Sequence, residues 1–133
     1  MITLNRKVPL KQINEKLARR VLSYGGSLMM AETHFQKGGV GELHKHESHE
    51  QLSYVAKGKL ELELGGTKTV LQQGDSFYVG KNVLHRVVIL EDAVVLDVDE
   101  LQGADRCAFP GKSGFRSRLL LIPRVAKDSR QRH

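Results

Sequence analysis

The feature of this 133-residue chain that most constrains its fold is the close spacing of its turn residues, which divide it into short apolar runs. Leu60, Leu62 and Leu64 alternate with charged residues, and this two-residue period predicts a strand with one buried face. Gly65-Gly66 follows, which predicts a β-hairpin over residues 59–72. Further strand-like runs are Arg19–Tyr24, Ser27–Phe35, Leu52–Ala56, Ser76–Val79, Arg86–Leu90 and Ala93–Val98. So many short strands predict an all-β sandwich or barrel.

The length and the charge distribution indicate how the chain is organised. It is long enough for one packed domain and short for two. Near the start, four apolar residues recur at helical spacing: Leu10, Ile13, Leu17 and Val21. We therefore expect residues 1–18 to form a helix or an arm. Residues 1–110 hold 14 Lys and Arg against 14 Asp and Glu. We expect these residues to form the barrel.

The formal net charge of +6 comes from the C-terminal end. Residues 111–133 hold seven Lys and Arg against Asp128 alone. We expect them to form a basic extension that docks on the barrel or on a partner subunit. A nucleic-acid partner is not expected, because it would need a basic face built into the fold itself.

Three further observations bear on the compartment. No apolar run is long enough for a transmembrane helix, and the N-terminus lacks the apolar stretch of a signal peptide. Cys107 is the only cysteine, which excludes an intrachain disulfide and a zinc site made of several thiolates. We therefore expect a cytoplasmic protein without a membrane partner.

The stretch HKHESHEQ, from His44 to Gln51, is the candidate functional site. His44 and His46 are two residues apart, so on a barrel strand both imidazoles project from the inner face. Neutral imidazole is a good ligand for first-row transition metals. Two histidines leave the coordination incomplete, so the fold must supply further ligands nearby; the returning strand begins around Glu50-Gln51, and His85 lies just after a later turn. His49 is expected in the loop, outside the ligand set.

Two motifs resemble those of the cupin superfamily. Residues 38–58 resemble its first motif, G-x5-H-x-H-x(3,4)-E-x6-G, and GDSFYVGKNVLH, which ends at His85, resembles the second, G-x5-P-x-G-x2-H. The second motif departs from the pattern at Gly80 for Pro and Asn82 for Gly, and Ile89 stands where the motif continues with Asn. The resemblance implies a single-domain double-stranded β-helix, the jelly-roll barrel of cupins.

The resemblance also implies one divalent metal ion, Mn, Fe, Ni or Zn, held by His44, His46, His85 and a fourth side chain. Six residues separate Gln51 from Gly58, as in the motif, whereas Glu50 would leave seven. Strand parity prevents both side chains from pointing inward. Gln51 is favoured as the fourth ligand, with Glu50 as the alternative.

Over residues 19–98 the chain looks most like small cupins of pectin and alginate degradation, which convert 4,5-unsaturated uronates to open-chain keto sugars. That resemblance implies Asp97 as a catalytic residue. It also implies a Phe and an Arg that serve the substrate, but Asp99 stands at the Phe position and Arg106 lies about three residues late. The uronate site is therefore incomplete by this pattern.

These observations favour an enzyme that uses its metal as a Lewis acid on a small oxygenated substrate, a sugar acid or keto compound. The reaction would be of the isomerase, lyase or cyclase type. The alternatives are a non-catalytic module that binds metal or a small ligand, and an iron-dependent dioxygenase-like cupin. We expect a homodimer.

Overall fold

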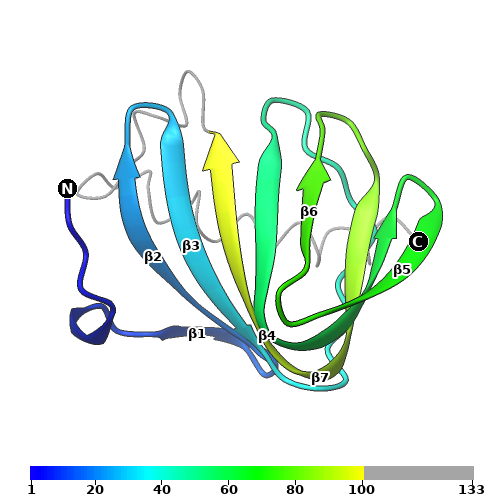
Figure 1. The fold of residues 1–133 in the computed structure, drawn as a ribbon, viewed down its shortest axis with the longest axis horizontal. Coiled ribbons are helices and arrows are strands. Elements are labelled where there is room, and N and C mark those ends of the chain that lie inside the picture. The colour runs from blue at the N-terminus through cyan, green and yellow to red at the C-terminus, as the bar shows by residue number, and fades with distance from the viewer. Residues whose placement is uncertain (101–133) are drawn as a thin grey trace.

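A computed structural model describes residues 1–100, and within them the chain is built almost entirely of strands (Figure 1). A short 3-10 turn, η1, comes first, and the elements are η1 (Asn5–Lys7), β1 (Lys11–Asn14), β2 (Leu17–Gly25), β3 (Leu28–Phe35), β4 (Gln51–Leu64), β5 (Thr67–Gln72), β6 (Ser76–Val79) and β7 (His85–Glu100). The all-β prediction is confirmed. None of the helices in this part of the chain is long and apolar enough to cross a membrane.

The strands pair antiparallel in the order β1-β2-β3-β7-β4-β5, with β6 added beside β4. β4 and β7 are the longest strands and belong to both walls of the barrel. Residues 93–100 of β7 lie between β3 and the first half of β4, whereas residues 85–91 pair with the second half of β4. Figure 1 shows the resulting curled sheet. This arrangement is the jelly-roll architecture expected from the sequence.

The length of these two strands differs from the prediction. Leu52–Ala56 and the run from Lys59 form one strand, and so do Arg86–Leu90 and Ala93–Val98. The pairing of β4 with β7 shifts register on both sides of Lys57, next to Gly58, whose φ is +86°. A bulge of this kind bends a strand and increases its twist without ending it. The turn residues Lys57 and Gly58 therefore mark a bend within β4 and do not end the strand.

The helix considered for the N-terminal residues is wrong, since those residues form β1 and the start of β2. Ala18 of β2 pairs with both Gln12 of β1 and His34 of β3, so the backbone is held in a ladder on both sides. Pairing within the sheet overrides the weak helical spacing of four apolar residues. The domain boundary at residue 110 and the basic extension over 111–133 lie outside the described residues.

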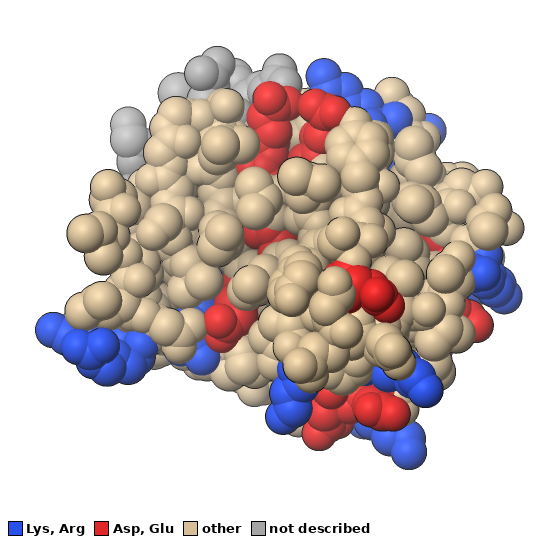
Figure 2. Space-filling model, in the orientation of Figure 1, with Lys and Arg blue, Asp and Glu red and all other residues tan. Residues whose placement is uncertain are grey.

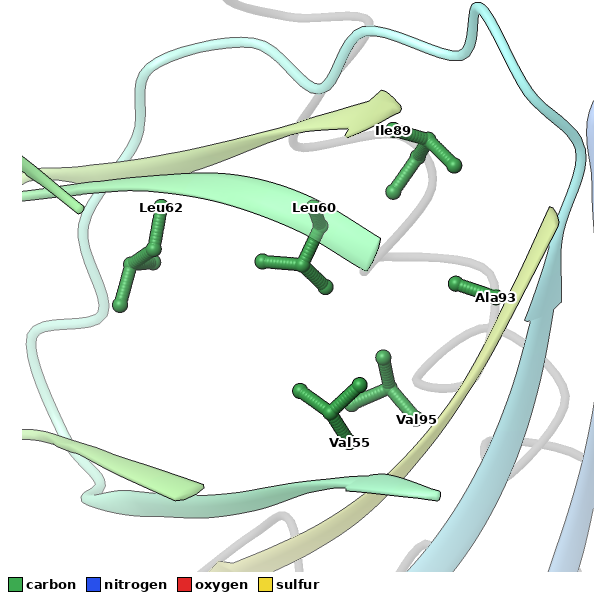
Figure 3. Packing of buried hydrophobic residues seen from close by; sticks show 6 residues of the cluster. All are labelled: Val55, Leu60, Leu62, Ile89, Ala93 and Val95. Atoms are coloured by element: carbon green, nitrogen blue, oxygen red, sulfur yellow. The ribbon is translucent and has the colours of Figure 1, made fainter. Parts of the chain in front are cut away.

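A small apolar core lies inside the barrel (Figure 3). β4 and β7 supply all of its buried members, which are Val55, Leu60, Leu62, Ile89, Ala93 and Val95. In Figure 3 side chains from the two walls point toward one another across the interior. Several other buried side chains are polar or charged; they are Arg19, Thr33, His46, Ser53, His85, Asp97 and Asp99. Buried polar side chains next to an apolar core are candidates for a functional site.

Candidate metal centre

Three histidines meet inside the barrel, as the sequence predicted. One ligand atom from each of His44, His46 and His85 lies within 4.8 Å of the other two. The backbone of His44 forms an isolated antiparallel bridge with His85, with N···O distances of 3.0 and 2.8 Å. The carbonyl of His46 accepts a 2.7 Å hydrogen bond from the Asn82 N–H. His44 and His46 thus lie on a segment that is bridged to β7 rather than on a full strand.

Backbone carbonyls orient two of these imidazoles. The Nδ1 atom of His44 lies 2.8 Å from the carbonyl oxygen of Glu42, and Nδ1 of His85 lies 2.9 Å from that of Val83. An Nδ1–H that donates to a carbonyl fixes the tautomer and leaves the Nε2 lone pair available to a metal. In each case the carbonyl belongs to the residue two positions before the histidine. These local contacts therefore leave Nε2 as the atom that each ring offers to a metal.

The imidazoles also favour the neutral form that a metal requires. Burial, together with the neighbouring His49, His44 and His85, lowers the pKa of His46 to about 3. Burial also lowers the pKa of His85, although its hydrogen bond to the Val83 carbonyl and the charge of Asp97 act in the opposite direction. Near neutral pH both rings are uncharged, so no proton competes for their lone pairs.

Gln51, the first residue of β4, lies beside this cluster. Its side chain hydrogen-bonds His46 and lines the same cavity. Its Nε2 donates to Ser53 Oγ at 2.9 Å and to Asp97 Oδ1 at 3.2 Å. Glu50 accepts a hydrogen bond from the Tyr78 hydroxyl, and Tyr78 is half exposed. Of the two alternatives for the fourth ligand, Gln51 is the one that lines the cavity with the histidines.

Two buried carboxyl groups, Asp97 and Asp99, lie on the inner face of β7. Ser53 Oγ donates to Asp97 Oδ1 at 2.5 Å, and Arg19 Nη2 lies 3.9 Å from Asp97 Oδ2. Burial raises the pKa of Asp97, while Arg19, Ser53 and Gln51 oppose the rise. Burial, reinforced by Asp97, raises the pKa of Asp99 to about 7. Asp99, noted in the sequence only as a departure from a pattern, is thus a second acidic group of the site.

A cavity of about 440 Å³ joins these groups. It is lined on its polar side by the three histidines, Gln51, Asp97, Asp99, Arg19 and Thr33, and on its apolar side by Phe35, Phe77, Ile89 and Val95. This size and this mixture are typical of a small-molecule site.

In the face seen in Figure 2, Lys and Arg side chains lie mainly at the margins of the molecule, and they do not form one basic patch.

His49 was expected outside the ligand set. His49 stacks on His46, with ring centroids 4.3 Å apart and planes at 28°, so it packs against the cluster. His34 Nε2 lies 2.7 Å from a carboxylate oxygen of Glu32, away from the cavity lining. Arg106 and His133 lie outside the described residues.

Arg19, Thr33 and Ser53 were not found from the sequence, although all three are buried and Arg19 and Thr33 line the cavity. The signal that could have found them is strand parity. Residues two or four positions from Asp97 on β7 face the interior, and so do the residues that pair with them on the neighbouring strands. Several of these positions hold polar residues.

Comparison with known proteins adds to this description. A family model described as Cupin domain matches residues 31–99. The pectin degradation protein KdgF of Dickeya dadantii (strain 3937) is 37% identical over 93 residues, which cover 70% of this chain and 84% of that protein. The solved structure of KdgF from Halomonas sp. is 31% identical with a TM-score of 0.74, covering 80% of this chain and 97% of the other. An RmlC-like cupin from Shewanella frigidimarina NCIMB 400 is 30% identical with a TM-score of 0.72, covering 79% and 94% of the two chains. Residues 31–99, which the Cupin domain model matches, contain His44, His46 and His85.

Proposed function

Since the chain belongs to the cupin family, we propose that it is a metal-dependent enzyme that opens the ring of a small unsaturated sugar acid. The observation that carries the proposal is the placement of Asp97 in the same cavity as the histidine cluster. The similarity to pectin degradation proteins supports a uronate as the substrate class. The cavity volume of about 440 Å³ is sufficient for one such sugar.

The donor set fits a divalent first-row ion. His44, His46 and His85 would hold it through Nε2, and Gln51 would add an amide oxygen as the fourth ligand. All four donors are neutral, so a bound ion keeps its full charge and supplies Lewis-acid chemistry to an oxygenated substrate. Imidazole suits Fe, Ni and Zn, and an amide oxygen with bound water also suits Mn, so we propose one ion per chain without choosing among them.

The protein's own task in this reaction is proton transfer. To open the ring of a 4,5-unsaturated uronate, the hemiacetal hydroxyl loses its proton as the bond between C1 and the ring oxygen breaks. The ring oxygen gains a proton, and the resulting enol becomes a ketone by moving a proton from oxygen to C4. Substrate and product contain the same atoms, so no further reactant is required.

Asp97 is the residue that we propose for this transfer. Ser53 and Gln51 both donate to its Oδ1, so the carboxyl group is held in one orientation. Oδ2 lies on the side of Arg19. Burial raises the pKa of this carboxyl group, which makes it a better proton carrier than an ordinary carboxyl group, and an isomerisation requires one residue that accepts and returns a proton.

Elemental analysis and a turnover assay test the proposal. The purified protein should contain close to one divalent ion per chain, and it should remove the ultraviolet absorbance of the conjugated double bond of an unsaturated uronate. Asp97→Asn should keep the metal and lose at least about 100-fold in turnover, as expected when a general acid or base is removed. Full metal content without turnover would refute the enzyme and leave a binding module, and oxygen consumption would instead indicate a dioxygenase-like cupin.

A further inference from the structure

We infer that Arg19 and Thr33 form a carboxylate-binding subsite in the wall of the cavity, where they hold the acid group of the substrate. The inference rests on the proposed function for the identity of the sugar. The subsite itself follows from the positions and the hydrogen bonding of these two side chains.

Arg19 and Thr33 are directly opposite each other on β2 and β3. Both line the cavity, and they are only 4% and 1% exposed. Among the described residues, Nε and Nη2 of Arg19 and Oγ1 of Thr33 have no hydrogen-bond partner. Buried polar atoms are nearly always paired in folded proteins, because an unpaired one destabilises the fold. Two neighbouring side chains with unpaired atoms in one cavity wall are therefore best explained by a ligand.

The ion pair with Asp97 does not satisfy Arg19. Its Nη2 is 3.9 Å from Asp97 Oδ2, which is too far for a hydrogen bond. The other oxygen of Asp97 already accepts from Ser53 and Gln51. A guanidinium carries five donors in a planar fork that matches the two oxygens of a carboxylate, and the Thr33 hydroxyl can donate to the same group.

The other cations of the cavity lining are engaged or lie at its rim. Arg86 Nε donates to Glu63 Oε1 at 2.9 Å. Lys16 is exposed, and its Nζ donates to the Lys37 carbonyl at 3.4 Å. Arg19 is thus the buried cation among the described residues of the lining. Binding a carboxylate away from water requires a buried partner of opposite charge, and Arg19 is the one that the cavity offers.

The register of the sheet gives the distance of Thr33 from Asp97, whereas the guanidinium of Arg19 itself reaches to 3.9 Å from the Asp97 carboxyl group. Thr33 pairs with Val95 of β7, and Ala31 pairs with Asp97, so Asp97 is one inward row further along the sheet. Two residues along a strand span about 7 Å, which is comparable with the width of a sugar ring. A sugar acid held by Arg19 and Thr33 would therefore have its ring beside Asp97.

A binding measurement tests this inference independently of turnover. Titration calorimetry with D-galacturonate and D-galactose, which differ in the oxidation of C6, measures the contribution of the carboxylate in the metal-loaded protein. We expect wild type to bind galacturonate at least tenfold more tightly than galactose. Arg19→Lys and Thr33→Val should each lose about tenfold or more for galacturonate, the usual effect of a lost hydrogen bond to a charged group, and should leave galactose unchanged.

Matched controls are available in the same sheet. Arg20→Lys changes the neighbouring arginine, which pairs with Glu32 outside the cavity lining, and Thr69→Val changes an exposed threonine of β5. Neither should alter either affinity. If Arg19→Lys fails to fold, Thr33→Val decides, because Val has the shape of Thr without the hydroxyl.

Unchanged galacturonate binding in a folded Thr33→Val protein, or a wild type without preference for the carboxylate, would overturn the subsite. The failure of the proposed function has a different signature. In that case the variants would still lose carboxylate binding although the wild-type protein turns over no unsaturated uronate.

Discussion

Replacing Gly58 by Ala should destabilise the barrel severely, for two reasons that can be separated. The φ of Gly58 is +86°, a conformation that costs an L-residue about 1–3 kcal/mol. A Cβ on Gly58 would also overlap the carbonyl oxygen of Asp92 and lie 2.7 Å from Cα of Ala93, both on β7. Overpacking of this kind adds about 1–3 kcal/mol. We expect a total loss of at least about 3 kcal/mol.

Gly66→Ala is the matched control for this change. Its φ of +87° is nearly the same, but nothing lies within 4 Å of the added Cβ. It should therefore cost only the backbone part, about 1 kcal/mol or somewhat more. In a domain of this size 1 kcal/mol corresponds to about 4–8 °C, so thermal unfolding followed by circular dichroism should show Tm values about 10 °C or more apart. Equal Tm values for the two variants would refute the close approach of β4 to β7 as the reason for a glycine at position 58.

Further predictions concern the metal, the acidic pair and assembly. Gln51→Ala should weaken metal binding by at least about tenfold in a competition titration, whereas Glu50→Ala should not; the opposite result would make Glu50 the ligand. In the metal-free protein the raised pKa of Asp99, about 7 against an ordinary 3.8, means that the folded state binds more protons than the unfolded state between these values. The contribution of Asp99 to stability should thus fall as pH rises from about 4 to 7, against the opposite contribution of His46, whose pKa is lowered. Asp99→Asn should therefore raise the stability at pH 7 relative to that at pH 4 in urea unfolding, and an unchanged difference between the two pH values would refute it. Finally, exposed apolar side chains on adjoining strands, among them Leu52 and Tyr78, favour the homodimer expected from the sequence, and a monomer mass in light scattering would refute it. Loss of the dimer on removing residues 115–133 would assign the basic extension to the interface.

The parts of the site that the sequence predicted are those with a fixed spacing. His44 and His46 are two residues apart, so their spacing alone predicts that both imidazoles share one face, whereas His85 was added through the resemblance of its motif to the second cupin motif, and the structure brings the three side chains together. The hairpin over 59–72 follows in the same way from alternation and a Gly-Gly turn, and β4 and β5 confirm it. Local spacing survives folding because it depends only on the neighbouring backbone.

The acidic and cationic groups of the site could not be predicted from hydrophobic patterning, because the usual pattern is reversed there. In β4 Leu52 is 55% exposed, whereas Ser53 beside it is 3% exposed. In β7 Asp97 and Asp99 are buried, and their apolar neighbour Val98 is less so. In sequence, a strand with a polar inner face shows the same alternation of polar and apolar residues as an ordinary strand. The alternation alone would therefore assign its apolar residues to the interior. The register with β3 and β7, a long-range property, decides which face is inside.

The same long-range network gives a reason for glutamine rather than glutamate at position 51. The amide nitrogen of Gln51 donates to Asp97, and the side chain also hydrogen-bonds His46. A glutamate there has no proton to donate when ionised, and its negative charge would lie about 3 Å from that of Asp97 in a buried site, where like charges repel strongly. One of the two carboxyl groups would then have to hold a proton. In the proposed mechanism Gln51 would instead connect the histidine cluster to Asp97 without adding charge, so an amide at this position would preserve both the charge of a bound ion and the proton exchange proposed for Asp97.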